Sequence, residues 1–388
     1  MPLLFALNLL SVLLCRRGTG ARGGRPPVPQ PRPPRGGLMR ATLWTGLLLA
    51  CAPAQAADTL TGAGSSAAAL LYRAWGQAYA RQHPVELQYE AIGSSAGLKK
   101  IRAGEVAFGA SDVAPSEAEL QRDQLVLVPT FVSGAVPVVN LPRVPRGRLR
   151  LSGELLADIY LGRVTRWNAP ELQALNPGLN LPDLPIRPVG RSDGSGTTYY
   201  VSDYLSQVSP AWLRQHGRQT QIAWADTVSR AKGSQGVVQA VQDTPGTIGY
   251  VDYNYVVEQD LNPVQLRNAA GQFVAPSVAG FRAALRASDW VSKGDFHAPL
   301  TQRTGAASWP IAMGSFVLLP RVSSQSEATE RALRFLMWTL LKGDTVVEGL
   351  SLVRLPDALQ AQAFKALSSV SDRQGRALGA IAFSSMTR

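Results

Sequence analysis

After residue 57 the chain alternates between two hydrophobic periods, one typical of strands and one typical of helices. Residues 85–92 place apolar side chains at every second position, which predicts a β-strand. Residues 67–82 place them at helical spacing, which predicts an amphipathic helix. The succession of strand, polar turn and helix start recurs at residues 59–82, 85–103, 106–119 and 186–205. This alternation predicts βαβ units and a mostly parallel sheet.

Each of these strands is predicted to end in a short polar turn. The turns are Gly62–Ser66, Gly93–Gly97, Ser111–Asp112 and Gly190–Thr198. In open α/β sheets, ligands bind beyond the carboxyl ends of the strands, where the first turn of each following helix has free N–H groups. The sequence therefore predicts two lobes whose polar turns face one ligand-binding cleft.

Two further apolar segments indicate how the lobes are divided. Residues 125–139 are interpreted as two strands around Ser133-Gly134, and a strand at 314–320 followed by a helix at 327–341 is predicted to return the chain to the first lobe. We expect a first lobe of residues 57–132 and 310–388 and a second lobe of residues 133–309. The hinge is expected at the crossings, near 131–134 and 309–310.

The first 56 residues have the composition of a targeting segment. Met39-Arg40 supplies a positive start, residues 43–52 an apolar stretch and Ala54–Ala56 a cleavage signal, which together are typical of a secretory signal peptide. We therefore expect a signal peptide at 39–56, cleavage before Ala57 and a periplasmic product. Residues 1–38 combine an apolar run with an Arg-, Pro- and Gly-rich tract, and we interpret them as a non-native upstream extension.

The formal net charge of +12 would fit a nucleic-acid-binding protein if it were clustered on the folded part. However, seven arginines and no acidic residue lie in the first 56 residues, which leaves +5 for the rest of the chain. This mild excess argues against a nucleic-acid partner.

Both cysteines, Cys15 and Cys51, precede the expected cleavage site. Disulfides, thiol catalysis and cysteine metal sites are therefore excluded from the mature chain. Its histidines and aspartates also lack metal-ligand spacing, so no metal site is expected. Residues 48–51 resemble a lipoprotein cleavage box with Cys51 as the lipid-bearing residue, but the intact signal at Ala54–Ala56 favours an unlipidated product.

The turn Gly190–Thr198 has the chemistry of an anion site. Gly194 and Gly196 allow a ligand to approach the backbone, and the following helix start offers free N–H groups. Ser195 and Thr197 add hydroxyl donors, while Arg191 adds a planar cation suited to a tetrahedral oxyanion. The alternative is structural, with Ser195 as a helix N-cap and Arg191 on the surface.

The turn Gly93–Gly97 also permits an enzymatic interpretation. It fits G-x-S-x-G between a strand and a helix, which is the setting of a serine-hydrolase nucleophile, here Ser95. The base would have to be His216, in a polar helix end, or His297, in a loop. Neither position favours a buried catalytic pair, and such pentapeptides often occur by chance.

Many separate motifs, in one order, resemble the periplasmic phosphate-binding proteins that serve ATP-driven phosphate importers. They are Leu60–Gly64, Ile92–Gly97, Phe108–Asp112, Asp158–Gly162 with Trp167, Asn176–Leu179, Arg191–Thr197, Gly246–Tyr253 and Trp309–Ile311. The resemblance implies an α/β, two-lobed periplasmic-binding-protein fold of type II, with mixed sheets flanked by helices. It implies inorganic phosphate as ligand, no cofactor and no enzymatic activity. The implied partner is an inner-membrane ABC permease with its ATPase subunits, served by a monomer; a phosphate-status sensor is the alternative role.

The resemblance also implies the site residues. Phosphate contacts are carried over to Ser66, Ala67, Ser94, Asp112, Arg191, Ser195, Gly196 and Thr197, with Asp193 orienting the arginine. The chain departs from the family pattern at Ser66, where threonine is common, and at Ala67, where phenylalanine is common. A hydroxyl and a backbone N–H survive these changes, so binding is expected to persist.

Asp112 is the residue expected to select the ion. A carboxylate beside an anion is repulsive unless the ligand has a proton to donate to it, which hydrogen phosphate has and sulfate at neutral pH lacks. The alternative for Asp112 is an N-cap for the helix predicted to begin near Pro115.

Overall fold

The computed structural model describes residues 58–386, which lie in the unit Gln55–Arg388 of the chain. The predicted extension at 1–38, the signal peptide at 39–56 and Cys51 fall outside the described residues and stay predictions. Between residues 58 and 386, no helix is both long and apolar enough to cross a membrane.

The main sheet joins nine strands of the described residues, in the order β2-β1-β3-β12-β4-β8-β6-β7 with β9 beside β4. They are β1 (Asp58–Gly64), β2 (Val85–Ala91), β3 (Phe108–Ser111), β4 (Leu125–Val139), β6 (Arg187–Arg191), β7 (Ser229–Ala231), β8 (Thr247–Asp252), β9 (Asn262–Pro263) and β12 (Ala312–Pro320). Strand β1 is parallel to β2 and β3, and β6 is parallel to β7 and β8. The central strands β12 and β4 are antiparallel to their neighbours. The expected parallel βαβ units are therefore confirmed on both flanks of a mixed sheet.

Helices flank the sheet on both faces. They are α1 (Ala69–Ala80), α2 (Ser94–Arg102), α3 (Glu117–Arg122), α4 (Gly153–Tyr160), α5 (Pro170–Leu175), α6 (Gly196–Val208), α7 (Pro210–Gln215), α8 (Gly233–Asp243), α9 (Tyr253–Glu258), α10 (Val278–Arg286), α11 (Asp289–Lys293), α12 (Ser326–Lys342), α13 (Asp344–Gly349), α14 (Asp357–Ser368) and α15 (Leu378–Met386). In the described part of the chain, two small sheets accompany them, one of β5 (Arg150–Leu151), β10 (Gln265–Arg267) and β11 (Phe273–Val274), the other of β13 (Val322–Ser323) and β14 (Ser371–Asp372).

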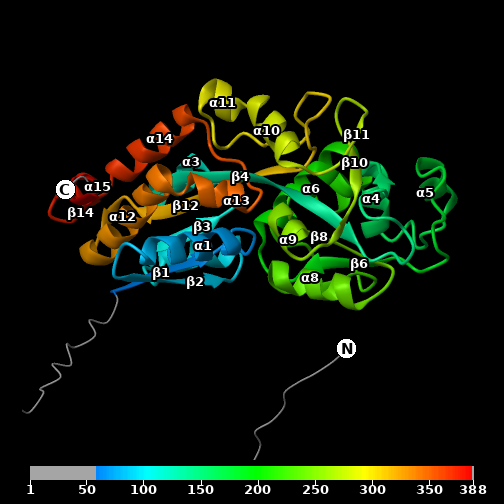
Figure 1. The fold of residues 1–388 in the computed structure, drawn as a ribbon, viewed down its shortest axis with the longest axis horizontal. Helices are drawn as coiled ribbons and strands as arrows, with labels where there is room; N and C mark the ends of the chain where they lie inside the picture. The colour runs from blue at the N-terminus through cyan, green and yellow to red at the C-terminus, as the bar shows by residue number, and fades with distance from the viewer. Residues whose placement is uncertain (1–57, 387–388) are drawn as a thin grey trace, which may run out of the picture. The chain divides into compact units, whose positions relative to one another are not determined.

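Strand β4 runs through both parts of the sheet (Figure 1). Its residues 125–134 pair with β12, and its residues 135–139 pair with β8. We call β2, β1, β3, β12 and residues 125–134 the β12 side, and residues 135–139 with β8, β6 and β7 the β8 side. Each side includes the helices and turns that connect its strands.

The interpretation of residues 125–139 as two strands around Ser133-Gly134 is wrong, because β4 is one continuous strand of 15 residues. Gly134 does not form a turn. It leaves room for the ring of Phe281, because a Cβ at this position would lie 2.2 Å from Cε1 of Phe281. Ser133 is not a turn residue either, since its Oγ donates a hydrogen bond to Oδ1 of Asp252 at 3.0 Å.

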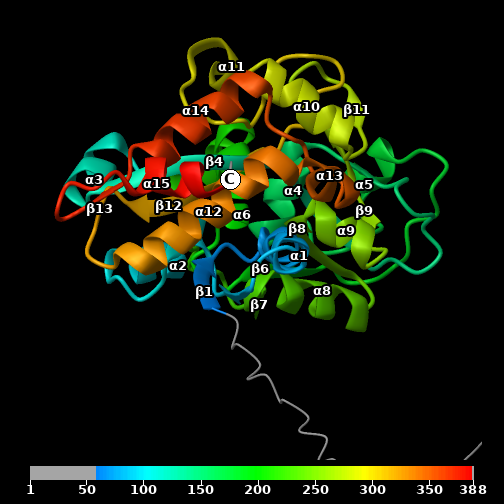
Figure 2. The same cartoon turned by 60° about the vertical axis from the view of Figure 1, so that its left-hand side comes forward.

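The helices that follow β12 pack on the β12 side. Helix α12 packs against α1 and β1, and α14 packs against β4. Figure 2 shows α12, α14 and α15 gathered at this side of the sheet.

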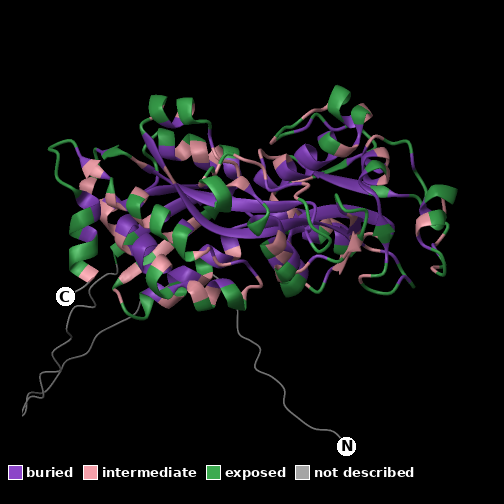
Figure 3. Ribbon diagram, turned by 90° about the horizontal axis from the view of Figure 1, so that it is seen from above, coloured by how far each residue is buried: buried purple, intermediate pink, exposed green. Residues whose placement is uncertain are grey.

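Within residues 58–386, buried side chains form two large clusters and a small one. One large cluster surrounds Trp75, Phe108 and Phe335 on the β12 side, and the other includes Trp167 and Trp212 on the β8 side. Figure 3 shows that the strands between the helices are buried. The cluster with Trp167 and Trp212 extends into the β12 side through Ala67, Val132 and Phe316, so apolar packing is continuous beneath the polar turns.

Candidate anion-binding site

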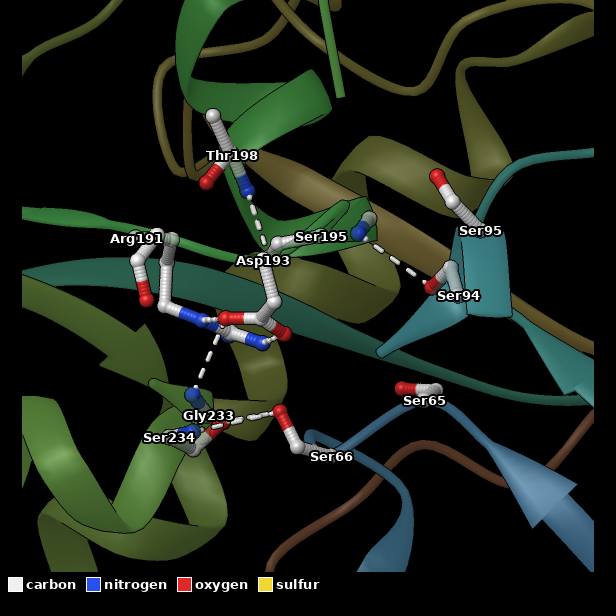
Figure 4. A network of polar contacts seen from close by, with 12 residues as sticks. Ser65, Ser66, Ser94, Ser95, Arg191, Asp193, Ser195, Thr198, Gly233 and Ser234 are labelled. Carbon is white, nitrogen blue, oxygen red and sulfur yellow. Dashed lines mark hydrogen bonds and ion pairs between the residues drawn. The ribbon is translucent and has the colours of Figure 1, made fainter. Parts of the chain in front are cut away.

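The carboxyl ends of the strands bring the predicted residues together from both sides of the sheet. Ser66 follows β1, Ser94 begins α2 after β2, and Asp112 follows β3. On the β8 side, Arg191 ends β6 and Ser195 is the N-cap of α6. Figure 4 shows the serines of the β12 side facing Arg191, Asp193 and Ser234 of the β8 side.

Arg191 is buried, with 2% of its surface exposed, so the surface alternative is wrong. Its Nε and Nη2 donate to the two carboxylate oxygens of Asp193 at 2.8 and 2.5 Å. Asp193 Oδ1 also accepts from the backbone N–H of Gly233 at 3.0 Å. Burial alone would raise the pKa of Asp193, but the hydrogen bonds and charge of Arg191 and the Gly233 N–H together lower it. The pair fixes the guanidinium plane, and the hydrogen bonds to Asp193 occupy Nε and Nη2.

The start of helix α6 supplies further donors. Ser195 is the N-cap, since its Oγ accepts from the N–H of Thr198 at 3.2 Å, so this part of the structural alternative is confirmed. The N–H of Gly196 donates to Oγ of Ser94 at 3.2 Å, across the two sides. Oγ1 of Thr197 is buried and has no hydrogen-bond partner among residues 58–386. A buried hydroxyl of this kind fits a polar ligand.

Asp112 is 1% exposed and accepts three hydroxyl hydrogen bonds. Ser65 and Ser94 donate to its Oδ2 at 2.6 and 3.3 Å, and Ser315 donates to its Oδ1 at 2.9 Å. Burial raises the pKa of Asp112, although hydrogen bonds from Ser65, Ser315 and Ser94 and the charge of Arg191 oppose this shift. The carboxyl group is therefore held in the site by neutral donors.

Asp112 is not a helix N-cap. Helix α3 begins at Glu117, and its N-cap is Ser116, which forms a capping box with Glu119. The structural alternative for Asp112 is therefore wrong.

Ser66 and Ala67 are held by the β8 side. Oγ of Ser66 lies 3.0 Å from Oγ of Ser234 and accepts from the N–H of Ser234 at 3.2 Å. The carbonyl of Ala67 accepts from Nδ2 of Asn254 at 3.1 Å, and the carbonyl of Ser66 accepts from the hydroxyl of Tyr255 at 2.9 Å.

The sequence interpretation missed several residues at this site, namely Ser65, Ser234, Asn254, Tyr255 and Ser315. A signal existed for Ser234, because it follows Gly233 at the start of α8 in the same way that Ser195 follows Gly194. Ser315 gave no local signal, since it lies within the buried strand β12. It sits where the pairing of β12 with β4 shifts register, and such bulges redirect a side chain.

The contacts of Ser95 do not match those of a hydrolase nucleophile. Its Oγ lies 3.4 Å from Oγ1 of Thr220, a hydroxyl that cannot act as a base at neutral pH. Nε2 of His297 lies 2.8 Å from the carbonyl oxygen of Pro115, and the ring of His216 packs against Trp212. Among the described residues, no cluster of three or more His, Cys, Asp or Glu side chains could hold a metal ion.

The arrangement as a whole can bind an oxyanion. It combines hydroxyl groups, the N-termini of α6 and α8, and one buried arginine whose charge is balanced by an aspartate. Such groups replace the water that an anion loses on burial, without a large excess of positive charge.

Comparisons with known proteins agree with this chemistry. A family model for the PBP superfamily domain matches residues 50–317. The phosphate-binding protein PstS of Haemophilus influenzae is 41% identical over 310 residues, which cover 80% of this chain and 92% of that protein. The protein of the same name from Pasteurella multocida is 40% identical over 319 residues, covering 82% and 92%.

Solved structures share the fold at low sequence identity. A high-affinity periplasmic phosphate-binding protein (PfluDING), solved with bound phosphate, has a TM-score of 0.65 and 19% identity, covering 84% of this chain and 97% of that chain. A phosphate-binding protein from Stenotrophomonas maltophilia has a TM-score of 0.64 and 18% identity, covering 84% and 98%. The fold is thus the predicted two-lobed α/β fold of periplasmic binding proteins. On the sequence similarity, the chain belongs to the PstS family of phosphate-binding proteins, within the PBP superfamily.

Proposed function

We propose that this protein binds inorganic phosphate in the periplasm and delivers it to an ATP-binding-cassette importer. The observation that carries the proposal is Asp112, a buried carboxyl group set among three serine hydroxyls beside the paired Arg191. Relatives named phosphate-binding protein PstS, about 40% identical over most of the chain, support it. The protein acts as a binding protein and not as an enzyme.

The proposed contacts to phosphate come from both sides of the sheet. The predicted contact residues are Ser66, Ala67, Ser94, Asp112, Arg191, Ser195, Gly196 and Thr197. Hydroxyls and backbone N–H groups donate to the phosphate oxygens, and the guanidinium of Arg191 balances part of the charge. Asp193 orients Arg191 through two hydrogen bonds.

Selectivity for phosphate follows from Asp112. Hydrogen phosphate can donate its proton to the carboxylate, while sulfate has no proton at neutral pH and would face a buried negative charge. Leaving a buried charged acceptor without its donor costs more than about 1–3 kcal/mol. Discrimination of roughly 100-fold or more against sulfate is therefore expected.

The lobes proposed for this function are residues 57–132 with 310–388, and residues 133–309. Two features support this division: β4 changes partner between Gly134 and Ala135, and β12 begins at Ala312, directly opposite Gly134. A ligand that contacts both lobes stabilises the arrangement in which they meet. The protein acts as a monomer that presents this arrangement to an inner-membrane permease with its ATPase subunits.

The function is tested by calorimetric titration of the purified protein, freed of carried-over ligand, with phosphate and then with sulfate. We expect one-to-one binding of phosphate and no heat from sulfate. If neither ion gave a heat of binding, the proposal would be contradicted, and the site would be expected to bind another small ligand.

The variant Arg191→Ala tests whether phosphate binds at the described site. Loss of this buried cation should weaken phosphate binding by about 2–5 kcal/mol, because the anion loses its charge partner and meets the uncompensated charge of Asp193. Arg166→Ala is the matched control, since Arg166 also pairs with an aspartate, Asp183, but at the surface. An unchanged dissociation constant in Arg191→Ala would contradict the site.

A further inference from the structure

The dipeptide Ser66-Ala67 is held by three residues of the opposite side of the sheet. Tyr255 donates its hydroxyl to the carbonyl of Ser66 at 2.9 Å, and Asn254 donates its amide to the carbonyl of Ala67 at 3.1 Å. Ser234 donates its backbone N–H to Oγ of Ser66 at 3.2 Å. Every one of these bonds joins the β12 side to the β8 side.

The three residues are themselves fixed. Ser234, Asn254 and Tyr255 are 1%, 2% and 4% exposed. Asn254 and Tyr255 lie in the first turn of α9, whose N-cap Asp252 accepts from the N–H of Asn254 at 3.1 Å and from Oγ of Ser133 at 3.0 Å. Because Ser133 belongs to β4, the start of α9 is tied to the strand that runs through both sides.

We propose that Asn254, Tyr255 and Ser234 form a latch that holds the Ser66–Ala67 peptide when the two sides meet, and that this latch sets the rate at which phosphate is released. The inference rests on the proposed phosphate-binding function. These residues are positioning residues, because they act through Ser66 and Ala67.

The latch orients the groups that are expected to contact the anion. Fixing the carbonyls of Ser66 and Ala67 fixes the peptide planes on either side, and with them the direction of the Ala67 N–H. Oγ of Ser66 accepts from the Ser234 N–H, so its single proton is left to donate to Ser234 Oγ or to a ligand. Ala67 carries only a methyl group, so Asn254 holds this segment by a hydrogen bond instead of ring packing.

Whether the latch hydrogen bonds change the association rate or the release rate of phosphate depends on when they form and break. Phosphate can reach one side of the open site before the latch bonds exist, so the association rate should depend little on them. Release requires the two sides to separate, and separation breaks every latch bond. Each lost hydrogen bond of about 0.5–1.5 kcal/mol should accelerate release by about two- to tenfold.

The sharpest test compares two tyrosines that bind neighbouring carbonyls. Tyr255 reaches the carbonyl of Ser66 from the β8 side, whereas Tyr89, in β2, donates to the carbonyl of Ser65 at 2.7 Å from the β12 side. The variants Tyr255→Phe and Tyr89→Phe each remove one hydroxyl and keep the ring. Only the first removes a bond between the two sides.

The measurement is the release of radiolabelled inorganic phosphate from the full protein, chased with unlabelled phosphate, together with the equilibrium dissociation constant. Tyr255→Phe should release phosphate about three- to fivefold faster and Asn254→Ala about tenfold faster, with association rates unchanged within twofold. Tyr89→Phe should leave the release rate unchanged. The thermal midpoint of the phosphate-free Tyr255→Phe protein should match that of the wild type.

The outcomes separate this proposal from the function on which it rests. If the wild-type protein fails to bind phosphate, the proposed function is wrong. If the wild type binds phosphate but Tyr255→Phe and Asn254→Ala release it at the wild-type rate, the latch is wrong and the function stands. Equal acceleration by Tyr255→Phe and Tyr89→Phe would also overturn the latch, because it would assign the effect to loop orientation within one side.

Discussion

Asp112 places a carboxyl group where an anion is expected to bind, and we propose that this residue selects the ion. Its three hydroxyl donors come from Ser65, Ser94 and Ser315, so the carboxyl is stabilised without a direct ion pair. Arg191 acts on it only through its charge. We therefore expect selectivity to depend on the protonation of the ligand and of Asp112 itself.

Replacing Asp112 by asparagine should relax the choice between phosphate and sulfate. Asparagine keeps the shape of the side chain but removes the negative charge, so sulfate no longer meets repulsion. We expect sulfate binding to become measurable by calorimetry, with discrimination reduced by about 10-fold or more. The matched control is Asp372→Asn, a buried aspartate paired with Arg376 in the β14 turn.

The pH dependence of the wild type provides a second readout for Asp112. Because burial raises its pKa, Asp112 takes up a proton at a higher pH than an ordinary aspartate. Sulfate exclusion should weaken as the pH falls through this raised pKa, and Asp112→Asn should show no such change. Sulfate exclusion that is the same at every pH would contradict the role of Asp112.

At the residue scale, the sequence predicts the site residues that lie at turns. It does not predict the site residues that lie inside a strand or helix. Arg191 ends a strand, and Asp112 and Ser195 lie in the turns after strands, so the turn pattern in the sequence points to them. Ser315 lies inside an apolar strand, and its bond to Asp112 spans 203 residues of sequence. No local pattern encodes a contact made by the pairing of β12 with β3.

At the element scale, helix α6 brings its first turn against the opposite side of the sheet. A Cβ on Gly196 would lie 2.4 Å from Cβ of Asp112 and 2.9 Å from Oγ of Ser94. This contact is too short for any side chain, so glycine is required at the start of α6 if the two sides are to meet. The glycine serves a close approach between elements, in addition to leaving its N–H free to donate.

Gly196→Ala should therefore prevent the two sides from meeting without unfolding either of them. Gly196 is the first residue of α6, where alanine is tolerated at least as well as glycine, so the phosphate-free protein should be as stable as the wild type. Phosphate affinity, measured by calorimetry, should fall by roughly 100-fold or more, since one side's contacts are lost.

The matched control for this variant is Gly236→Ala, in the first turn of α8. A Cβ there would meet its nearest neighbour, Cβ of Ala231, at an ordinary 3.6 Å. This control should bind phosphate like the wild type. Wild-type affinity in Gly196→Ala would show that the close approach is not needed for binding.

Strand β4 shows why a sequence pattern predicts a strand more reliably than it predicts which residues the strand contacts. Its apolar run predicts buried strand correctly, but Ser133-Gly134 resembles a turn. In the structure, Ser133 hydrogen-bonds to Asp252, and the absence of a side chain at Gly134 leaves room for the ring of Phe281. Both contacts involve residues far along the chain, so no local signal distinguishes them from turn chemistry.

At the scale of the whole molecule, we expect Asp252 to make global stability depend on pH. It is fully buried, and its Oδ2 has no hydrogen-bond partner among residues 58–386. Burial raises the pKa of Asp252 to about 8; the N–H of Asn254 and the hydroxyl of Ser133 oppose this shift, and the charge of Asp112 adds to it. In the unfolded chain an aspartate has a pKa of about 3.9.

The free energy of unfolding should therefore fall as the pH rises from about 4 to about 8. In this window the folded state keeps a proton that the unfolded state has released, which removes up to about 1.4 kcal/mol of stability per pH unit. Below the window both states are protonated, and above it both are ionised. Asp252→Asn keeps the Oδ1 contacts and removes this proton, so its stability relative to the wild type should rise with pH.

Urea unfolding of both proteins at pH 5 and pH 7.5 measures this difference. The stability of Asp252→Asn relative to the wild type should increase by at least about 1 kcal/mol between the two pH values. Parallel stability curves for the two proteins would show that Asp252 does not hold its proton in the folded state.

The pairing of Arg191 with Asp193 affects how strongly ligand binding should depend on the salt concentration around the protein. Because this cation is already neutralised and the other donors are uncharged, the site projects little positive potential into solution. Dissolved salt screens charges beyond about 10 Å at 0.1 M, but it hardly weakens short hydrogen bonds in a buried site. The protein should therefore capture its ligand almost equally well in dilute and in saline surroundings, at the expense of any long-range attraction that would speed the encounter.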